Sequence, residues 1–419
     1  MCVRKQSTAM RAAVRCGLVL LAVLLALPML PAPVDGASSL AQELGLSPEA
    51  IPPDMGQTDL EVYVPATGHT VRGMMLDYWR ANGAAAVYGN PISEPFASPD
   101  GRYSQAFERG IFQFRAELQW SDEPMVRLMP IGTQEVKETR TGKRADGRRT
   151  GADRRASVWR PGVESAARQE EVAALGGRFS EVSGFSIAGE FAAWYDSNEG
   201  WHYLGAPISE PHRARGVTVQ YFEGAVLMSV EGVATPAPLP AEKPWAYGFD
   251  TMPVPQDGRP EFSEALFIQH PNPSGVDPSL LTGRKHIVIS IPDQTMTVYQ
   301  GSDIVLQSLI STGLPPNDTE TGEFHVRLKY EQQDMAGFTS GTGEVIGHEG
   351  DEGVSGERYE VADVPHVMYF NMDAEALHGA YWHNNFGQRM SHGCVNQPLD
   401  VAAFMYDFAP LGTQVTVIG

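Results

Sequence analysis

The sequence predicts a mainly β C-terminal domain over residues 283–419, preceded by an N-terminal α+β repeat region. Apolar and polar residues alternate over 286–291 and again over 295–299, on either side of a Pro-Asp-Gln turn. This period of two is typical of strands joined as a hairpin. Residues 68–96 align without gaps to residues 184–212, and both stretches contain the run Pro-Ile-Ser-Glu-Pro. The alignment indicates a duplicated unit. A chain of 419 residues is long enough for several such parts.

The N-terminus has the order of charged, apolar and small residues that is typical of a secretory signal peptide. Four basic residues precede an apolar run over 17–30, and small residues follow around 34–37. The apolar run is shorter than the roughly 20 residues that span a bilayer. We therefore expect residues 1–36 to be a cleaved signal peptide, the mature protein to be exported, and no stable membrane span to remain. An uncleaved anchor is the alternative.

Each repeat unit is expected to contain a short amphipathic helix, a turn and a β-hairpin. The helices are predicted over 71–79 and 187–195, within units that span 60–135 and 171–235. Between residues 137 and 168, ten Lys or Arg stand against four Asp or Glu without apolar periodicity, so residues 136–170 are predicted to be a basic flexible linker. Seven prolines over 236–260 predict a stiff Pro-rich linker over 236–282.

In the C-terminal domain, further strands are predicted over 304–311, 323–328, 367–371 and 414–418, with one helix over 399–408. Residues 337–356 contain seven glycines, which do not hold one conformation cheaply. This segment is either a mobile lid or a surface insertion. The net charge of −20 argues against nucleic acid as a partner.

The chemistry is concentrated near the C-terminus, where Cys394 is the only cysteine beyond residue 16 and lies close in sequence to His378, His383 and His392. The thiolate is the reactive form of cysteine, and its ordinary pKa is about 8.5. An adjacent imidazole and the N-terminus of the helix after Pro398 are expected to lower the pKa of Cys394 toward about 6. The pattern favours a cysteine nucleophile.

The four side chains could instead bind zinc, but no compact pair of ligand motifs is present, so we expect no metal and no cofactor.

The spacing from His378 to the run Ser-His-Gly-Cys-Val-Asn at 391–396 resembles the signature of the L,D-transpeptidases, the bacterial enzymes that cross-link the cell wall. The run Ser-Thr-Gly at 311–313 and the sequence around 319–324 are also similar to the family, although this chain has Thr-Glu-Thr-Gly where the family usually has Thr-Pro-x-Gly. The resemblance implies a β-sandwich-like catalytic domain over 283–419. The repeats resemble the LGFP-type repeats of exported bacterial wall enzymes, at Tyr-Gly-Asn-Pro (88–91) and Leu-Gly-Ala-Pro (204–207).

The resemblance also implies roles for individual residues. Cys394 is expected to be the nucleophile and His378 the general base, with the carbonyl of Gly379 orienting its ring. The N–H groups of Gly393 and Cys394 are expected to form the oxyanion hole, and His392 to support the site. The expected loop-shaping and substrate-binding residues are Ser391, Asn396, His383, Arg389, Tyr381 and Trp382.

The implied substrate is a peptidoglycan stem peptide, cleaved at an L,D bond and transferred through a thioester to an amine acceptor. The implied location is the cell wall or periplasm. L,D-carboxypeptidase action and protein anchoring are alternatives that use the same site, and a non-catalytic wall-binding scaffold is an alternative of another class. The repeats are expected either to contact wall polymer or to carry their aromatic residues Trp79, Trp194, Trp201 and Tyr203 only as core.

Overall fold

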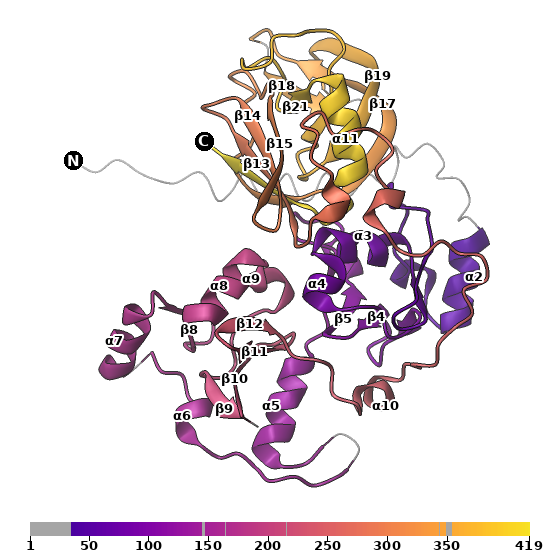
Figure 1. The fold of residues 1–419 in the computed structure, drawn as a ribbon. Coiled ribbons are helices and arrows are strands. Elements are labelled where there is room, and N and C mark those ends of the chain that lie inside the picture. Colours follow the sequence, from indigo (N-terminus) through magenta and orange to yellow (C-terminus); the bar gives the residue numbers. More distant parts are fainter. Residues whose placement is uncertain (1–34, 145–146, 164, 215, 343, 349–353) are drawn as a thin grey trace.

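The structure is a computed structural model, and it describes residues 35–144, 147–163, 165–214, 216–342, 344–348 and 354–419 (Figure 1). Nearly all of the predicted signal peptide over 1–36 lies outside the described residues. Within the described part of the chain, no helix combines the length and apolar character needed to cross a bilayer.

The first repeat unit consists of two short helices and a four-stranded antiparallel sheet in the order β3-β4-β5-β6. Helix α2 (Asp35–Leu44) and the short η1 (Pro48–Ala50) precede it. Its elements are β1 (Val62–Val64), β2 (His69–Val71), α3 (Gly73–Ala81), α4 (Ala84–Tyr88), β3 (Phe96–Ala97), β4 (Tyr103–Phe107), β5 (Gly110–Phe114), η2 (Ala116–Leu118) and β6 (Val126–Leu128).

The second repeat unit has the same order of elements, and its sheet has the order β12-β11-β10-β9. Its elements are β7 (Arg178–Phe179), β8 (Ser186–Ile187), α8 (Gly189–Ser197), α9 (Gly200–Tyr203), β9 (His212–Ala214), β10 (Val217–Tyr221), β11 (Val226–Val230) and β12 (Val233–Pro236). The predicted helices over 71–79 and 187–195 thus correspond to α3 and α8, each shifted by two residues.

The two units also share a buried hydrogen-bond pattern. The side-chain amide of Gln105 donates to the carbonyls of Thr70 (2.7 Å) and Ser93 (2.9 Å). In the second unit, Gln220 donates in the same way to Ser186 (2.6 Å) and Ser209 (3.1 Å). The hydroxyl of Ser93 accepts a hydrogen bond from the backbone N–H of Ala106 (3.0 Å), and the hydroxyl of Ser209 accepts one from the backbone N–H of Tyr221 (2.9 Å). Because buried backbone groups must be paired, this repetition explains why the Pro-Ile-Ser-Glu-Pro run and the later glutamine occur in both units.

The two segments that were expected to be linkers carry structure of their own. Residues 136–170 contain most of α5 (Ile131–Thr141), all of α6 (Ala156–Trp159) and the start of α7 (Ala166–Ala174). In α6, Val158 and Trp159 are buried against Tyr221 of β10. A high density of arginine therefore does not prevent this segment from packing, because its few apolar residues are spaced to reach unit 2.

The proline-rich segment 236–282 runs along unit 1 rather than standing free of it. It contains α10 (Lys243–Tyr247), η3 (Glu264–Leu266) and η4 (Pro278–Leu280). Backbone hydrogen bonds join Val254 to Gly68 and Phe262 to Tyr63, and the guanidinium of Arg80 pairs with Glu264 at 3.1 Å. The extended backbone of this segment thus forms hydrogen bonds with β1 and with the turn after β1.

The C-terminal domain consists of two five-stranded sheets with a shared core between them. The first has the order β15-β14-β13-β22-β16 and the second β18-β17-β19-β20-β21. All neighbours are antiparallel except the pairs β13–β22 and β20–β21. Helix α11 (Leu399–Phe408) packs against β19 and β20. The strands are β13 (Lys285–Ser290), β14 (Thr295–Gln300), β15 (Asp303–Leu309), β16 (Gly322–His325), β17 (Leu328–Thr339), β18 (Val345–His348), β19 (Glu357–Tyr369), β20 (Ala376–Gly379), β21 (Val395–Gln397) and β22 (Gln414–Ile418).

The glycine-rich segment 337–356 differs from the expected unstructured loop. Its first residues continue β17, and β18 pairs back onto them with Gly337 opposite His348. A Cβ at Gly337 would lie 2.8 Å from the hydroxyl of Tyr359, so a larger residue there would require the Tyr359 ring to shift. The acidic residues Glu349, Asp351 and Glu352 lie outside the described residues. The described part of this segment is thus an edge hairpin of the second sheet.

The repeat region and the C-terminal domain pack against each other. Figure 1 shows α3 and α4 of unit 1 directly beneath the two sheets, with unit 2 beside unit 1. One buried apolar cluster continues from Trp79 and Tyr203 of the units to Ile287 and Phe404 of the C-terminal domain. Because Trp79 is fully buried and Tyr203 is 1% exposed, both are core residues and neither can contact a polymer at the surface, whereas Trp201 is 37% exposed.

Candidate active site

The parallel pairing of β20 with β21 places the predicted histidine and cysteine on neighbouring segments of the chain. The register sets Leu377 opposite Val395 and His378 opposite Asn396, so Cys394 immediately precedes the strand that lies beside the histidine. The two residues are 16 positions apart in the chain. His378 thus lies on β20, while Cys394 lies in the bend that leads into the edge strand β21.

Cys394 is half-buried and lies against the apolar cluster of Val364, Val367 and Ala376. Burial raises the pKa of the Cys394 thiol to about 11. A hydrogen bond from the backbone N–H of Ala376 opposes this rise, and the carboxyl of Glu375 adds to it. The expected lowering of the Cys394 pKa is therefore wrong for this structure, because desolvation outweighs the hydrogen bond from Ala376.

His378 is 2% exposed, and its Nδ1 lies 3.2 Å from the carbonyl oxygen of Gly379. Since a carbonyl can only accept, Nδ1 carries the proton and Nε2 is left as the acceptor. Burial lowers the pKa of His378 to about 4, against the opposing effect of the Gly379 carbonyl. The ring is therefore a neutral base with a defined tautomer at pH 7.

The loop before Cys394 is held by its own side chains. The hydroxyl of Ser391 donates to the carbonyl of Cys394, and it accepts from the N–H of Gly393 at 3.2 Å. Gly393 has φ +120, a conformation that favours glycine. The Gly393 N–H, expected in the oxyanion hole, would therefore have to exchange its serine partner for a substrate oxygen.

Two residues of this neighbourhood had no role in the sequence prediction. Thr319 donates its hydroxyl hydrogen to the carbonyl of Gly393 at 2.6 Å. The buried carboxylate of Glu375 accepts from the backbone N–H of Glu320 (3.1 Å) and from the side chain of Asn371 (2.9 Å). Burial raises the pKa of Glu375 to about 7. Thr319 lies in a run that the family comparison had marked, whereas no local pattern distinguishes a carboxyl that folding buries.

Aromatic side chains line the surroundings of the thiol. The exposed ring of His392 stacks on Tyr359 of β19, with centroids 4.8 Å apart. Burial and the neighbouring Cys394 both raise the pKa of Tyr359. Trp382 is tilted over His378 at 5.7 Å, and the hydroxyl of Tyr381 donates to the carbonyl of Ala362 at 2.7 Å. Trp382 and Tyr381 are both exposed, which suits side chains that meet a substrate.

The remaining predicted residues bind other parts of the protein. Asn396 and His383 are joined by a 2.8 Å hydrogen bond between Nδ2 and Nε2, which ties the loop to β21. The guanidinium of Arg389 pairs with the carboxylate of Asp318. Arg389 is consequently not free in this structure to meet a substrate carboxylate, and that expectation would require the pair to separate.

The zinc alternative for His378, His383, His392 and Cys394 gains no support from the geometry. Over the described ranges, only one group of three or more potential ligands has its donor atoms within 4.8 Å of one another, and it contains none of these four. His392 is turned toward Tyr359 and His383 toward Asn396.

Comparisons with known proteins agree with the class that these residues indicate. Residues 284–417, about a third of the chain, match the YkuD family model, the L,D-transpeptidase catalytic domain. An L,D-transpeptidase of Enterococcus faecium, solved as a cysteine-to-serine mutant, is 26% identical over 32% of this chain and 49% of that one, with a TM-score of 0.27. The chain thus spans about half the length of the first solved structures it matches.

Two further solved structures are similar at lower identity. The L,D-transpeptidase of Mycobacterium smegmatis is 19% identical over 52% of this chain and 79% of that one, with a TM-score of 0.29. L,D-transpeptidase 1 of Mycobacterium tuberculosis is 24% identical over 33% and 64%, with a TM-score of 0.25. No curated protein matches the chain.

Proposed function

We propose that this protein is a peptidoglycan L,D-transpeptidase whose C-terminal domain acts through a thioester on Cys394. The observation that carries the proposal is the pairing of β20 with β21, which places Cys394 two register positions from His378, a buried histidine of defined tautomer. The family match over 284–417 supports the same class.

The protonation states of Cys394 and His378 determine how the first step would proceed. At pH 7 the thiol is protonated, because burial raises its pKa to about 11, and the imidazole is neutral, because burial lowers its pKa to about 4. Sγ would attack the carbonyl carbon of the L,D bond while its proton passes to Nε2 of His378. The C–S bond forms, the C–N bond breaks, and the leaving D-amino acid takes the proton from His378.

The second step regenerates the thiol. The amine of another stem peptide attacks the thioester carbonyl and gives its proton to His378, and the C–S bond breaks as that proton returns to Sγ. Water in place of the amine would make the same site an L,D-carboxypeptidase, and a protein amine would make it an anchoring enzyme. A neutral resting pair suits this chemistry because neither group needs to be ionised before substrate excludes water from the site.

The repeats and the N-terminus define the expected surroundings of the enzyme. We infer that residues 1–36 direct export, so that the mature protein acts outside the cytoplasm, in the cell wall or periplasm. We also infer that the repeat units contact wall polymer, through exposed aromatic side chains such as Trp201 (37% exposed) and Trp120 (67% exposed).

The test is covalent capture by a carbapenem, followed by intact-mass and peptide analysis. The parent protein should gain one acyl group, located on Cys394, and should release the terminal D-amino acid from a soluble tetrapeptide stem. Cys394→Ala should lose both activities, whereas the exposed Glu357→Gln should lose neither. Acylation that persists in Cys394→Ala would exclude this cysteine as the nucleophile, and retained folding without any capture by the parent protein would favour a wall-binding scaffold.

A further inference from the structure

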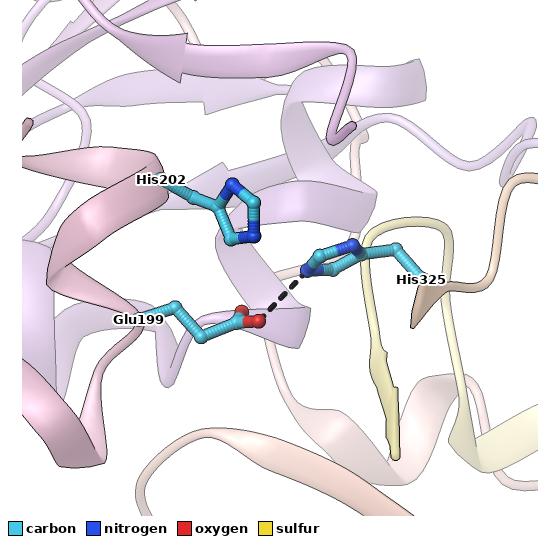
Figure 2. Close-up of side chains that lie close together, drawn as sticks. All are labelled: Glu199, His202 and His325. Atoms are coloured by element: carbon cyan, nitrogen blue, oxygen red, sulfur yellow. Dashed lines mark hydrogen bonds and ion pairs between the residues drawn. The ribbon is translucent and has the colours of Figure 1, made fainter. Parts of the chain in front are cut away.

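Three side chains with metal-binding atoms meet where unit 2 contacts the C-terminal domain. They are Glu199 and His202, from the start and the body of α9, and His325, the last residue of β16. One donor atom from each lies within 4.8 Å of the others. Figure 2 shows the three side chains pointing toward one another from different elements. None of the three belongs to the proposed active site, and nothing in the transfer reaction uses them.

The two ligand positions in unit 2 differ from the equivalent positions in unit 1. In the alignment of the two units, Glu199 corresponds to Gly83 and His202 to Ala86. Gly83 and Glu199 each precede a short helix in the left-handed conformation, with φ +87 and φ +46. That conformation is natural for glycine and unfavourable for a residue with a side chain. Unit 2 therefore keeps a strained backbone at the position where it places a fully buried carboxylate.

A second carboxylate orients the histidine of α9. Oε2 of Glu123, from unit 1, lies 2.8 Å from Nδ1 of His202. A carboxylate behind one ring nitrogen leaves the other nitrogen as a ligand atom, and metal-binding histidines commonly have such a partner. The two rings of His202 and His325 lie edge to face, with centroids 5.2 Å apart. The imidazoles of His202 and His325 thus both lie next to the carboxylate of Glu199.

His325 is held on one side only. Its Nε2 lies 2.9 Å from Oε1 of Glu199, while its buried Nδ1 has no hydrogen-bond partner within the described part of the chain. A histidine buried to 3% exposure normally satisfies both ring nitrogens. Because no second bond fixes the ring, a small rotation can adjust its distance to a ligand placed between the three side chains.

The cluster has a positively charged neighbour, the guanidinium of Arg284. It binds Oε2 of Glu199 and lies 3.1 Å from Oδ1 of Asn82, so one oxygen of the Glu199 carboxylate remains on the side of the histidines. This positive neighbour opposes the binding of any cation, so the types of donor atom have to account for affinity and selectivity. Two imidazole nitrogens and one carboxylate oxygen are the donors preferred by zinc and related ions.

We propose that Glu199, His202 and His325 bind one divalent transition-metal ion of the zinc class, which joins unit 2 to the C-terminal domain. Water would complete a four-coordinate site. Glu123 brings unit 1 into the same assembly through His202. Strand β16 begins at Gly322, shortly after Thr319, so the ion would also anchor the strand that leads from the loop beside Cys394.

The direct test is titration of the metal-stripped full chain with Zn²⁺ by calorimetry, carried out in the Cys394→Ala background to remove the thiol as a competing ligand. One equivalent should bind saturably. His202→Gln and His325→Gln should each weaken the affinity at least about 10-fold. His270→Gln is the matched control, because it removes a histidine that pairs with a carboxylate, Asp407, elsewhere. Equal affinity in all four proteins would overturn the proposal.

Anomalous diffraction at the zinc edge gives a readout that needs no variant of the cluster. A peak between Glu199, His202 and His325 is expected in crystals grown with Zn²⁺. A peak only at other histidines, or no peak, would instead mean that the three residues form an ion-pair network with Arg284. Neither measurement depends on transfer activity, so failure of the metal proposal leaves the proposed function standing, and the converse also holds.

Discussion

Thr319 and Gly393 are joined by a hydrogen bond of 2.6 Å from the threonine hydroxyl to the glycine carbonyl. The same hydroxyl oxygen accepts from the N–H of Gly313 at 2.9 Å. One buried side chain thus holds the loop before Cys394 and the turn after β15 in a fixed relation. The family-like sequence at 319–322, which lacks the usual proline, keeps the residue that makes this connection.

Thr319→Val should therefore slow acylation of Cys394 by roughly 10-fold and destabilise the protein by about 1–3 kcal/mol, because a buried carbonyl and a buried N–H lose their partner while the shape of the side chain is kept. Carbapenem acylation rates and urea unfolding would measure the two effects. Thr321→Val, at an exposed position in the same segment, is the control and should change neither. Unchanged acylation in Thr319→Val would mean that the loop is held by Ser391 alone.

The pH dependence of acylation tests the neutral thiol and imidazole. With a His378 pKa of about 4 and a Cys394 pKa of about 11, the reactive neutral pair persists between those values. The rate should be nearly level from about pH 5 to 10 and fall below about pH 4, as His378 becomes protonated and can no longer accept the thiol proton. Stopped-flow acylation would give the profile, and an inflection near pH 6 would contradict it.

His378→Gln should lower that rate by about 10²–10⁴, the usual contribution of a general base. The matched control is His392→Gln, because His392 is exposed and stacks on the ring of Tyr359, whereas His378 is buried beside a backbone carbonyl. A collapse of acylation in the control, with little change in His378→Gln, would exchange the two roles.

The raised pKa of Glu375 predicts how its contribution to the stability of the protein changes with pH. Burial raises the pKa of Glu375 to about 7, above the value of about 4.5 in an unfolded chain. Between those values the folded protein binds more protons than the unfolded chain, so the contribution of this carboxyl to stability falls as the pH rises from about 4.5 to 7. Glu375→Gln should remove that dependence, so its Tm relative to the parent should be higher at pH 8 than at pH 5. The exposed Glu357→Gln serves as the control. Parallel Tm curves for parent and Glu375→Gln would contradict the prediction.

The contacts between the parts predict how fragments behave. Lys285 is 1% exposed, and its Nζ lies 3.1 Å from Glu264, outside the C-terminal domain as the sequence delimits it. Burial lowers the pKa of Lys285 to about 8. A fragment of residues 262–419 should therefore melt several degrees above one of residues 283–419, since the shorter one leaves this lysine without its carboxylate. Lys285→Met in the shorter fragment should recover part of the loss, and equal melting of the two fragments would mean that the lysine is solvated once unit 1 is absent.

Binding to insoluble wall sacculi tests the role proposed for the repeats. The full chain should pellet with sacculi, residues 262–419 should not, and Trp120→Ala should weaken pelleting because it removes a ring that is 67% exposed. Binding carried by the basic segment 136–170 would decline steeply with salt, whereas binding through aromatic side chains would persist. Equal pelleting of full chain and fragment would identify the repeats as spacers.

Local pattern was sufficient for the elements whose residues are adjacent in the chain. The alternation over 286–291 and 295–299 corresponds to β13 and β14, and the apolar run over 399–408 is α11. It missed most of the long strands β17 and β19, apart from the end of β19 in the strand predicted over 367–371, because both mix charged, polar and apolar residues. Their pairing comes from partners far away in the chain, and short-range periodicity carries no information about such partners.

The sequence by itself determined that Cys394 and His378 stand in one short, chemically specific run, and that a unit of about 30 residues is duplicated. Residue types and their spacing follow directly from the sequence and do not depend on the fold. Only the tertiary structure decided the protonation states of that pair, because desolvation depends on what the fold packs around each group. It likewise decided that Glu199 and His202 meet His325, more than 100 residues away, because only the packing of unit 2 on the C-terminal domain brings those side chains together.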